Sequence, residues 1–277
     1  MRKIIGSIIS ALAFGGVILP TMAADLKAPI YKAPLEVWSW TGVYVGGNVG
    51  YSWGRSSTDT RVSNNGNGAS LFSTNSSYDL RGGEIGVQVG VNWQSGIWVG
   101  GFETDVQGTG QRGSASFTCP AGVCNTSAVV PAASRLLTGS ISQKLAWFGT
   151  LRGRFGVTVT PTVLAYGTAG VAYGEVDSDG VLSGISAAGP VSNPFSGSDS
   201  TTTKTGWAAG FGVEGRLAAN WTGKVEYLYV ALNSFSTTGL LLTNVPPINV
   251  AYSSRVNDSI VRVGLNYKFD NGPLLGW

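Results

Sequence analysis

Apolar residues recur at every second position through most of this chain, which is the period of a β-strand. The first such run covers 42–53, where one parity carries Val43, Val45, Val49, Tyr51 and Trp53. The other parity of the same run carries small or polar residues. This run therefore predicts a strand with one apolar face and one small or polar face.

Seven further segments continue the alternation, at roughly 80–93, 97–107, 142–159, 162–176, 204–218, 220–231 and 256–269. Each is long enough for a tilted strand that crosses a bilayer, which needs about 9–11 residues. Strands of soluble proteins are shorter, with a typical length of about 5–6 residues. The pattern thus predicts eight strands of membrane-crossing length.

The connections between these strands alternate in length. Three are short, at 94–96, 160–162 and 219–220. Four are long and rich in Ser, Thr, Asn and Gly, at about 54–79, 108–141, 177–203 and 232–255. This alternation is typical of outer-membrane barrels, which have tight periplasmic turns and long external loops. We therefore expect an all-β fold over 41–269, an eight-stranded antiparallel up-and-down transmembrane β-barrel.

Aromatic residues of the apolar parity gather at the strand ends. Those next to long connections are Trp53, Trp147, Tyr173, Trp207 and Tyr229. Those next to short turns or the last strand end are Trp93, Trp98, Trp221 and Phe269. Two such groups are expected where aromatic rings lie at the two headgroup levels of a membrane. The alternatives are a soluble barrel with aromatic core fillers and a secreted lipocalin-like barrel, since period two does not say which face is inside.

Charge is sparse, at 12% of residues, and the strand charges lie on the parity opposite to the apolar one. These residues are Glu84, Glu103, Asp105, Lys144, Arg152, Arg154, Glu214, Arg216, Lys224, Glu226, Arg262 and Lys268. Lone charges are costly on a lipid-facing wall, so we expect them in the lumen. An eight-stranded barrel is just wide enough inside for side chains to fill it. A salt-bridged plug is the favoured interpretation, and a narrow conduit is the alternative.

The N-terminus predicts export. Met1-Arg2-Lys3 precedes an apolar run and a small-residue cleavage site, so 1–23 is interpreted as a signal peptide, with an uncleaved anchor as the alternative. Residues 24–40 are then a periplasmic segment, and 270–277 form a C-terminal tail. In an oxidising compartment Cys119 and Cys124 are expected to form a loop disulfide. A redox-active pair is less favoured because the spacing is not Cys-x-x-Cys.

Enzymatic sites find little support in the composition. The chain contains no histidine, which excludes Ser-His-Asp triads, Cys-His pairs and histidine-based zinc sites. Glu103 and Asp105 share one face, but Arg152 and Arg154 on the next predicted strand make ion pairing the favoured role. A formal net charge of +3 is too small to argue for nucleic acid. We predict no enzyme, no catalytic residue, no cofactor and no metal site.

Several segments resemble a known family. They are Trp40 to Trp53, Leu151 to Gly156, Trp207 to Glu214, Val225 to Tyr229 and Val261 to Phe269. Together they resemble the small outer-membrane "porin family", or outer-membrane immunogenic proteins, of alphaproteobacteria. The resemblance implies an OmpA-like barrel, placed by the barrel-insertion machinery, abundant at the surface and antigenic. The family usually ends at the closing-strand phenylalanine, so either Phe269 or Trp277 is the terminal aromatic here.

These observations predict a protein of the bacterial outer membrane with a structural and surface-interaction role. A low-conductance porin for small solutes is the alternative. Haemin binding, which the resemblance implies for some members, is a third hypothesis that would use Tyr78 or Tyr252. The expected partners are outer-membrane lipid and lipopolysaccharide, the insertion machinery, periplasmic chaperones, and host or environmental surface ligands.

Overall fold

The computed structural model describes residues 38–64, 67–120, 123–124, 137–186, 189–194, 200–241 and 248–269. The predicted signal peptide, most of the 24–40 segment and the 270–277 tail lie outside these residues. Among the described residues, no helix is long and apolar enough to cross a membrane.

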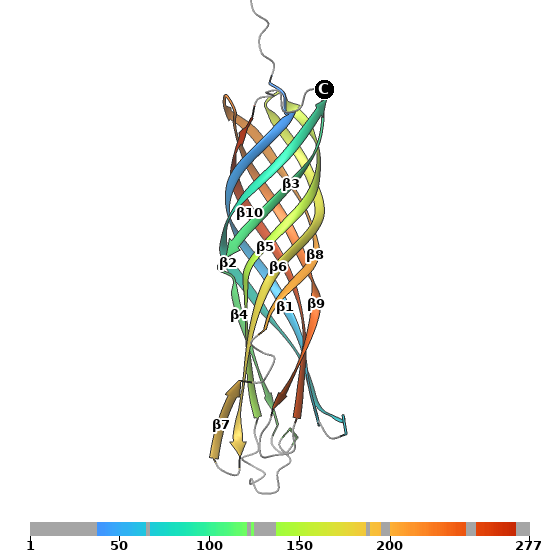
Figure 1. The fold of residues 1–277 in the computed structure, drawn as a ribbon, viewed down its shortest axis with the longest axis vertical. Coiled ribbons are helices and arrows are strands. Elements are labelled where there is room, and N and C mark those ends of the chain that lie inside the picture. The colour runs from blue at the N-terminus through green and yellow to red at the C-terminus, as the bar shows by residue number, and fades with distance from the viewer. Residues whose placement is uncertain are drawn as a thin grey trace, which may run out of the picture. The chain divides into compact units, whose positions relative to one another are not determined.

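The described chain forms strands throughout. Their bounds are β1 Gly42–Asn64, β2 Ser70–Ser95, β3 Trp98–Thr109, β4 Arg112–Cys119, β5 Leu137–Thr160, β6 Val163–Ser186, β7 Gly189–Pro194, β8 Ser200–Ala218, β9 Trp221–Leu241 and β10 Ile248–Lys268. β3 and β4 follow one another in the space between β2 and β5, and β7 pairs with the outer part of β6. The others complete an antiparallel ring that closes between β1 and β10, so the predicted eight-stranded barrel is confirmed (Figure 1).

The strands are tilted in the ring because their register is staggered. The cross-strand register runs from Trp53 through Ser259, Tyr229, Ala209, Ala169, Gly153, Phe102 and Val91 back to β1 at Val43. One circuit therefore displaces the register by ten residues, from 53 to 43. Such a stagger over eight strands corresponds to a tilt of about 40°. Two register partners on neighbouring strands therefore differ in height along the barrel axis by about one residue.

The two ends of the barrel differ. The short connections β2–β3, β5–β6 and β8–β9 lie at the end where β1 begins and β10 ends, which we call the turn end (Figure 1). Gly96 in the first of these connections has a φ of 62°, a left-handed conformation that favours glycine. The opposite end carries the longer connections and is called the extension end.

The strands continue much further toward the extension end than the sequence predicts. β1 runs to Asn64 and β2 starts at Ser70, so most of the expected 54–79 loop is a hairpin, and the other three expected loops are also partly strand. In this extension Ser56, Thr58, Thr60 and Val62 are buried inside the ring, whereas the residues between them are exposed. The apolar outer face, from which the strands were predicted, ends at Trp53, and the outer face beyond it is polar. The backbone hydrogen bonds between the strands nevertheless continue, because ring closure leaves no free edge.

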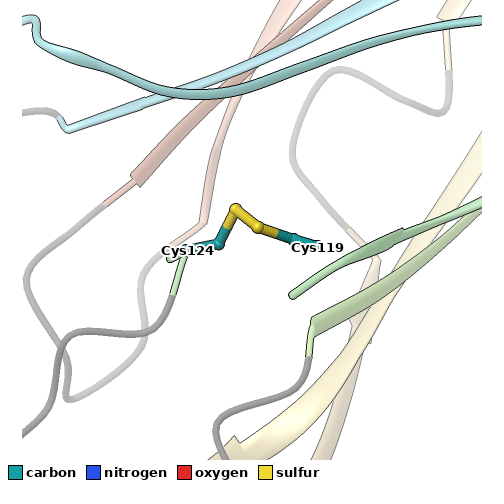
Figure 2. Close-up of a disulfide and its surroundings, with 2 residues drawn as sticks. All are labelled: Cys119 and Cys124. Atoms are coloured by element: carbon teal, nitrogen blue, oxygen red, sulfur yellow. A yellow bond between two sulfur atoms is a disulfide. The ribbon is translucent and has the colours of Figure 1, made fainter. Parts of the chain in front are cut away.

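An apolar cluster closes the far part of the extension. Its buried members are Val62, Phe117, Cys119, Cys124, Ile141 and Val250. Cys119, the last residue of β4, is bonded to Cys124, with Cα atoms 6.1 Å apart (Figure 2). The predicted disulfide cysteines therefore lie bonded to one another within this cluster.

Candidate functional site: the barrel lumen and its outer rim

A network of buried ion pairs fills the middle of the lumen, and we call it the lumen network. Its four cations are Arg152, Arg154, Lys224 and Arg262, and its four carboxylates are Glu103, Asp105, Glu214 and Glu226. They come from β3, β5, β8, β9 and β10, and all their side chains are only 0–3% exposed. The charges balance, so the network as a whole is neutral.

Two arginines form the centre of the lumen network. One Arg152 nitrogen lies 2.6 Å from Glu103 and 2.8 Å from Asp105, and its other terminal nitrogen lies 3.1 Å from Glu226. Arg262 approaches the same carboxylates from β10, at 2.5 Å from Glu226 and 2.9 Å from Asp105. Each arginine therefore bridges carboxylates of two different strands, β3 and β9.

The other two cations, Arg154 and Lys224, lie next to this centre on its turn-end side. Arg154 lies 2.6 Å from Glu214, and Lys224 lies 2.8 Å from Glu103. The Tyr44 hydroxyl donates to Glu103 at 2.8 Å and accepts from Arg154 at 2.7 Å. Good hydrogen-bond geometry is what makes buried charges tolerable.

Sequence reasoning missed the two tyrosines of this network. The Tyr166 hydroxyl donates to Glu226 at 3.1 Å, and the Arg154 guanidinium lies 4.0 Å from the Tyr166 ring centre. The position of Tyr44 could have indicated its role in the lumen, because it is a large aromatic residue on the face of β1 that otherwise carries small and polar residues. Gly90 faces it on β2, and a Cβ there would collide with the Tyr44 ring.

Three cations predicted for the lumen lie outside the lumen network, but only the prediction for Lys144 is wrong, because Arg216 and Lys268 lie at the turn-end mouth of the lumen. Lys144 is exposed on the outer wall because β5 carries a bulge between Leu145 and Trp147, which reverses the parity of the residues before it. Arg216 is exposed at the turn end, and Lys268 is half-buried there. Both place their charge 4.6 Å from the ring centre of Trp38.

Glu84 is inside the lumen as predicted by its parity, but it joins no ion pair among the described residues. It is 5% exposed, and neither of its carboxylate oxygens has a hydrogen-bond partner there. Gln107, on the neighbouring β3, is fully buried and its amide atoms are likewise unpartnered. Asp258 on β10 accepts a hydrogen bond from Gln111.

The lumen beyond the network, toward the extension end, has two unlike walls. The wall of β1, β2 and β3 carries the polar groups around Glu84. The opposite wall carries an apolar cluster of Leu145, Phe148, Ala172, Val176, Ala208, Leu228, Val230, Leu232 and Ile260. On the turn-end side of the network, Trp40 is 2% exposed and packs with Val99, Leu164 and Tyr166. Filled layers thus lie on both sides of the ion pairs.

The outer wall carries two aromatic belts. Toward the extension end lie Trp53, Trp147, Tyr173, Trp207 and Tyr229, with Trp207 and Tyr229 ring centres 5.4 Å apart. Toward the turn end lie Trp93, Trp98, Trp221 and Phe269. Between the belts the wall exposes apolar side chains, for example Ile85 at 67% and Phe211 at 64%. An apolar band between two aromatic belts matches the lipid-facing surface of a membrane barrel.

The remaining candidate groups offer little chemistry. Tyr78 is buried, and its hydroxyl donates to Gln143 inside the extension. The side chain of Tyr252 lies outside the described residues. No cluster of His, Cys, Asp and Glu suited to a metal ion occurs among the residues that the structure describes.

Comparison with known proteins places this geometry among membrane barrels. A family model for the outer membrane protein beta-barrel domain matches residues 9–269. The 31 kDa outer-membrane immunogenic protein of Brucella melitensis is 36% identical over 275 residues, which covers 96% of this chain and 98% of that protein. The 22 kDa outer membrane protein of Rhizobium leguminosarum bv. viciae is 27% identical over 243 residues, or 88% and 82% of the two chains. The outer membrane protease OmpT of Escherichia coli aligns with a TM-score of 0.41 and 11% identity, over 84% of this chain and 99% of that one.

Proposed function

Because this chain belongs to the outer-membrane β-barrel family, we propose that it is a structural and surface-interaction protein whose lumen is closed to solutes. It is an outer-membrane protein, and its relatives include outer-membrane immunogenic proteins. The turn end is then periplasmic, and the extension end faces outward, as is usual for such barrels. The proposed function includes no enzymatic step. The chain has no histidine.

The observation that carries the proposal is the lumen network. Its eight side chains are 0–3% exposed and electrically balanced. A permeating ion would have to separate buried ion pairs, and removing one partner of such a pair costs about 3–5 kcal/mol. The residues packed around Trp40 fill the lumen on the turn-end side of the network, and the apolar cluster lines it on the extension-end side. These three layers support a plug.

A low-conductance porin is the second candidate, and one observation favours it. Glu84 and Gln107 present buried polar atoms without protein partners on one wall of the lumen. Buried polar groups of this kind are usually satisfied by water. A hydrated passage along β2 and β3 would bypass the apolar cluster, but it would still end at the lumen network.

Recording of single channels in planar bilayers tests the two candidates. We expect the purified mature protein to give no reproducible conductance steps. Arg152→Ala should introduce steps, because it removes contacts to three carboxylates and vacates the centre of the lumen. Arg112→Ala, which removes an exposed arginine of the outer wall, is the matched control and should stay silent. Stable steps from the unmodified protein would refute the plug and favour the porin.

The exposed part of the barrel supports the surface-interaction role. β1 and β2 continue past the extension-end belt, and their outer faces there are polar and exposed. We propose that this projecting part meets host or environmental ligands, and that the insertion machinery and periplasmic chaperones deliver the chain to the membrane. Antibody raised against the folded protein should label intact cells, and loss of labelling after removal of 57–77 would map the exposed region.

A further inference from the structure

Five cations lie side by side on the outer wall at the extension end. They are Arg55, Arg81, Arg112, Lys144 and Arg255, and all five are exposed. They come from β1, β2, β4, β5 and β10, which are consecutive strands of the ring. We call this group the basic band.

The basic band lies within a narrow range of heights, just beyond the extension-end aromatic belt. Arg81 is the register partner of Trp53, and Arg55 lies two residues past Trp53 on β1. Arg81 pairs with Arg112, which in turn pairs with Lys144, three residues before Trp147. Arg255 pairs with Ser57, the next outward-facing residue of β1 after Arg55. The belt marks the membrane–water interface, so these charges reach the headgroup region of the outer leaflet.

Like charges meet in the middle of the band. Arg81, Arg112 and Lys144 oppose one another directly on three adjacent strands, and like charges in such cross-strand pairs are destabilising. Carboxylates stand at two other register positions, because Arg55 is opposite Asp79 and Lys144 is opposite Asp177. Asp79 pairs with Arg81 at 2.8 Å. Within the described residues, Arg55, Arg112, Lys144 and Arg255 form no ion pair within 4 Å. The band therefore carries an excess of positive charge.

A surface pocket lies inside the band, between β4 and β5. It has a volume of about 460 Å³ and is lined by Arg112, Lys144, Ser114, Ser142, Gln143 and Asp179. The two cations and two serine hydroxyls can all donate to a multivalent oxyanion. Arginine matches the geometry of phosphate with paired hydrogen bonds. Asp179 on one side of the pocket restricts where the anion can lie.

Resting on the outward-facing extension end of the proposed function, we propose that the basic band binds the phosphate groups of the phosphorylated glycolipid in the outer leaflet of this membrane. The phosphates lie at headgroup level against Arg112 and Lys144, with Arg55, Arg81 and Arg255 continuing the contact around the wall. The acyl chains lie below, against apolar side chains such as Ile85 and Val106. β6 carries Glu175, Asp177 and Asp179 instead. The glycolipid therefore binds only the part of the wall that the basic band covers.

The test is a binding titration with the mature, folded protein in detergent micelles and diphosphorylated lipid A as the probe. We expect Arg112→Gln with Lys144→Gln to weaken lipid A binding at least tenfold. The exchange Arg112→Lys with Lys144→Arg should stay within about threefold of the unmodified protein, since the pocket keeps both charges and one guanidinium for paired hydrogen bonds to phosphate. Arg61→Gln with Arg216→Gln removes two exposed charges outside the band and should leave binding unchanged.

Two probes identify what is recognised. Lipid A with the same acyl chains but without phosphates should bind at least tenfold more weakly, and millimolar inorganic phosphate should not displace the intact lipid. Equal binding of the dephosphorylated lipid would overturn the proposal, as would full displacement by inorganic phosphate. Heat-modifiable gel migration checks that each variant is folded. Should the Arg112 and Lys144 pair not fold, Arg55→Gln with Arg255→Gln must show the loss of binding, and unchanged binding there refutes the band.

Discussion

Arg262→Met removes a buried charge from the lumen network and keeps an unbranched, flexible side chain that ends where the guanidinium begins. The guanidinium lies 2.5 Å from Glu226, 2.9 Å from Asp105 and 3.6 Å from Glu103, and its side chain is fully buried. The substitution leaves four carboxylates facing three cations. One negative charge of the lumen network then has no counter-charge within that network.

The expected cost follows from this imbalance. Breaking a buried ion pair by removing one partner destabilises a protein by about 3–5 kcal/mol. With a urea m-value of about 2 kcal/mol per molar, the unfolding midpoint should fall by roughly 2 M. Arg262→Met combined with Glu226→Gln restores neutrality, with three cations and three carboxylates. This double variant should therefore regain part of the lost stability.

The assay is urea unfolding of the protein in lipid vesicles, followed by tryptophan fluorescence and by heat-modifiable gel migration. Arg61→Gln serves as the comparison, because it removes an exposed arginine outside the basic band and surface changes of this kind usually stay within about 0.5 kcal/mol. The reasoning is refuted when Arg262→Met lowers the midpoint no more than Arg61→Gln does. It also fails when the compensated double variant is less stable than Arg262→Met alone.

Three further substitutions probe other layers of the barrel. Glu84→Gln should raise the urea midpoint, because it removes a buried charge that lacks protein hydrogen bonds; a lower midpoint would indicate that the carboxylate is paired through water. Replacing Cys119 and Cys124 with serine should cost about 2 kcal/mol by the loop-closure relation, and faster proteolysis should be confined to the extension, with an unchanged membrane-embedded core as the control. Phe269→Ala should reduce the fraction of heat-modifiable protein in outer-membrane extracts, whereas Trp277→Ala should not; the reverse result would make Trp277 the terminal aromatic.

The sequence was sufficient for the parts of the structure that depend on local periodicity. The odd positions from Val43 to Trp53 face outward, whereas Tyr44, Asn48 and Ser52 face inward, and this alternation is what period two requires. Strand number also followed from the sequence, because each crossing needs its own alternating segment. The outer limit of the strands did not, since β1 continues to Asn64 with a polar outer face that resembles a loop.

The partners of the charged residues could not be read from spacing. Parity placed Glu103 and Arg152 inside, and these two residues are indeed register partners on β3 and β5. Arg262 belongs to β10, yet it meets Asp105 of β3 across the lumen, 157 positions away in the chain. Such contacts depend on ring closure and on the ten-residue stagger, which no single segment encodes.

Sequence alone thus determined the strand period, the division of each strand into an apolar and a polar face, and the absence of histidine chemistry, because each is a property of local composition. Tertiary structure decided which charges neutralise one another and which reach the outside. The bulge before Trp147 turned Lys144 from a predicted lumen residue into a member of the basic band, opposite Arg112. One extra residue in one strand reverses the direction of every side chain before it, and only the paired neighbours reveal where that residue lies.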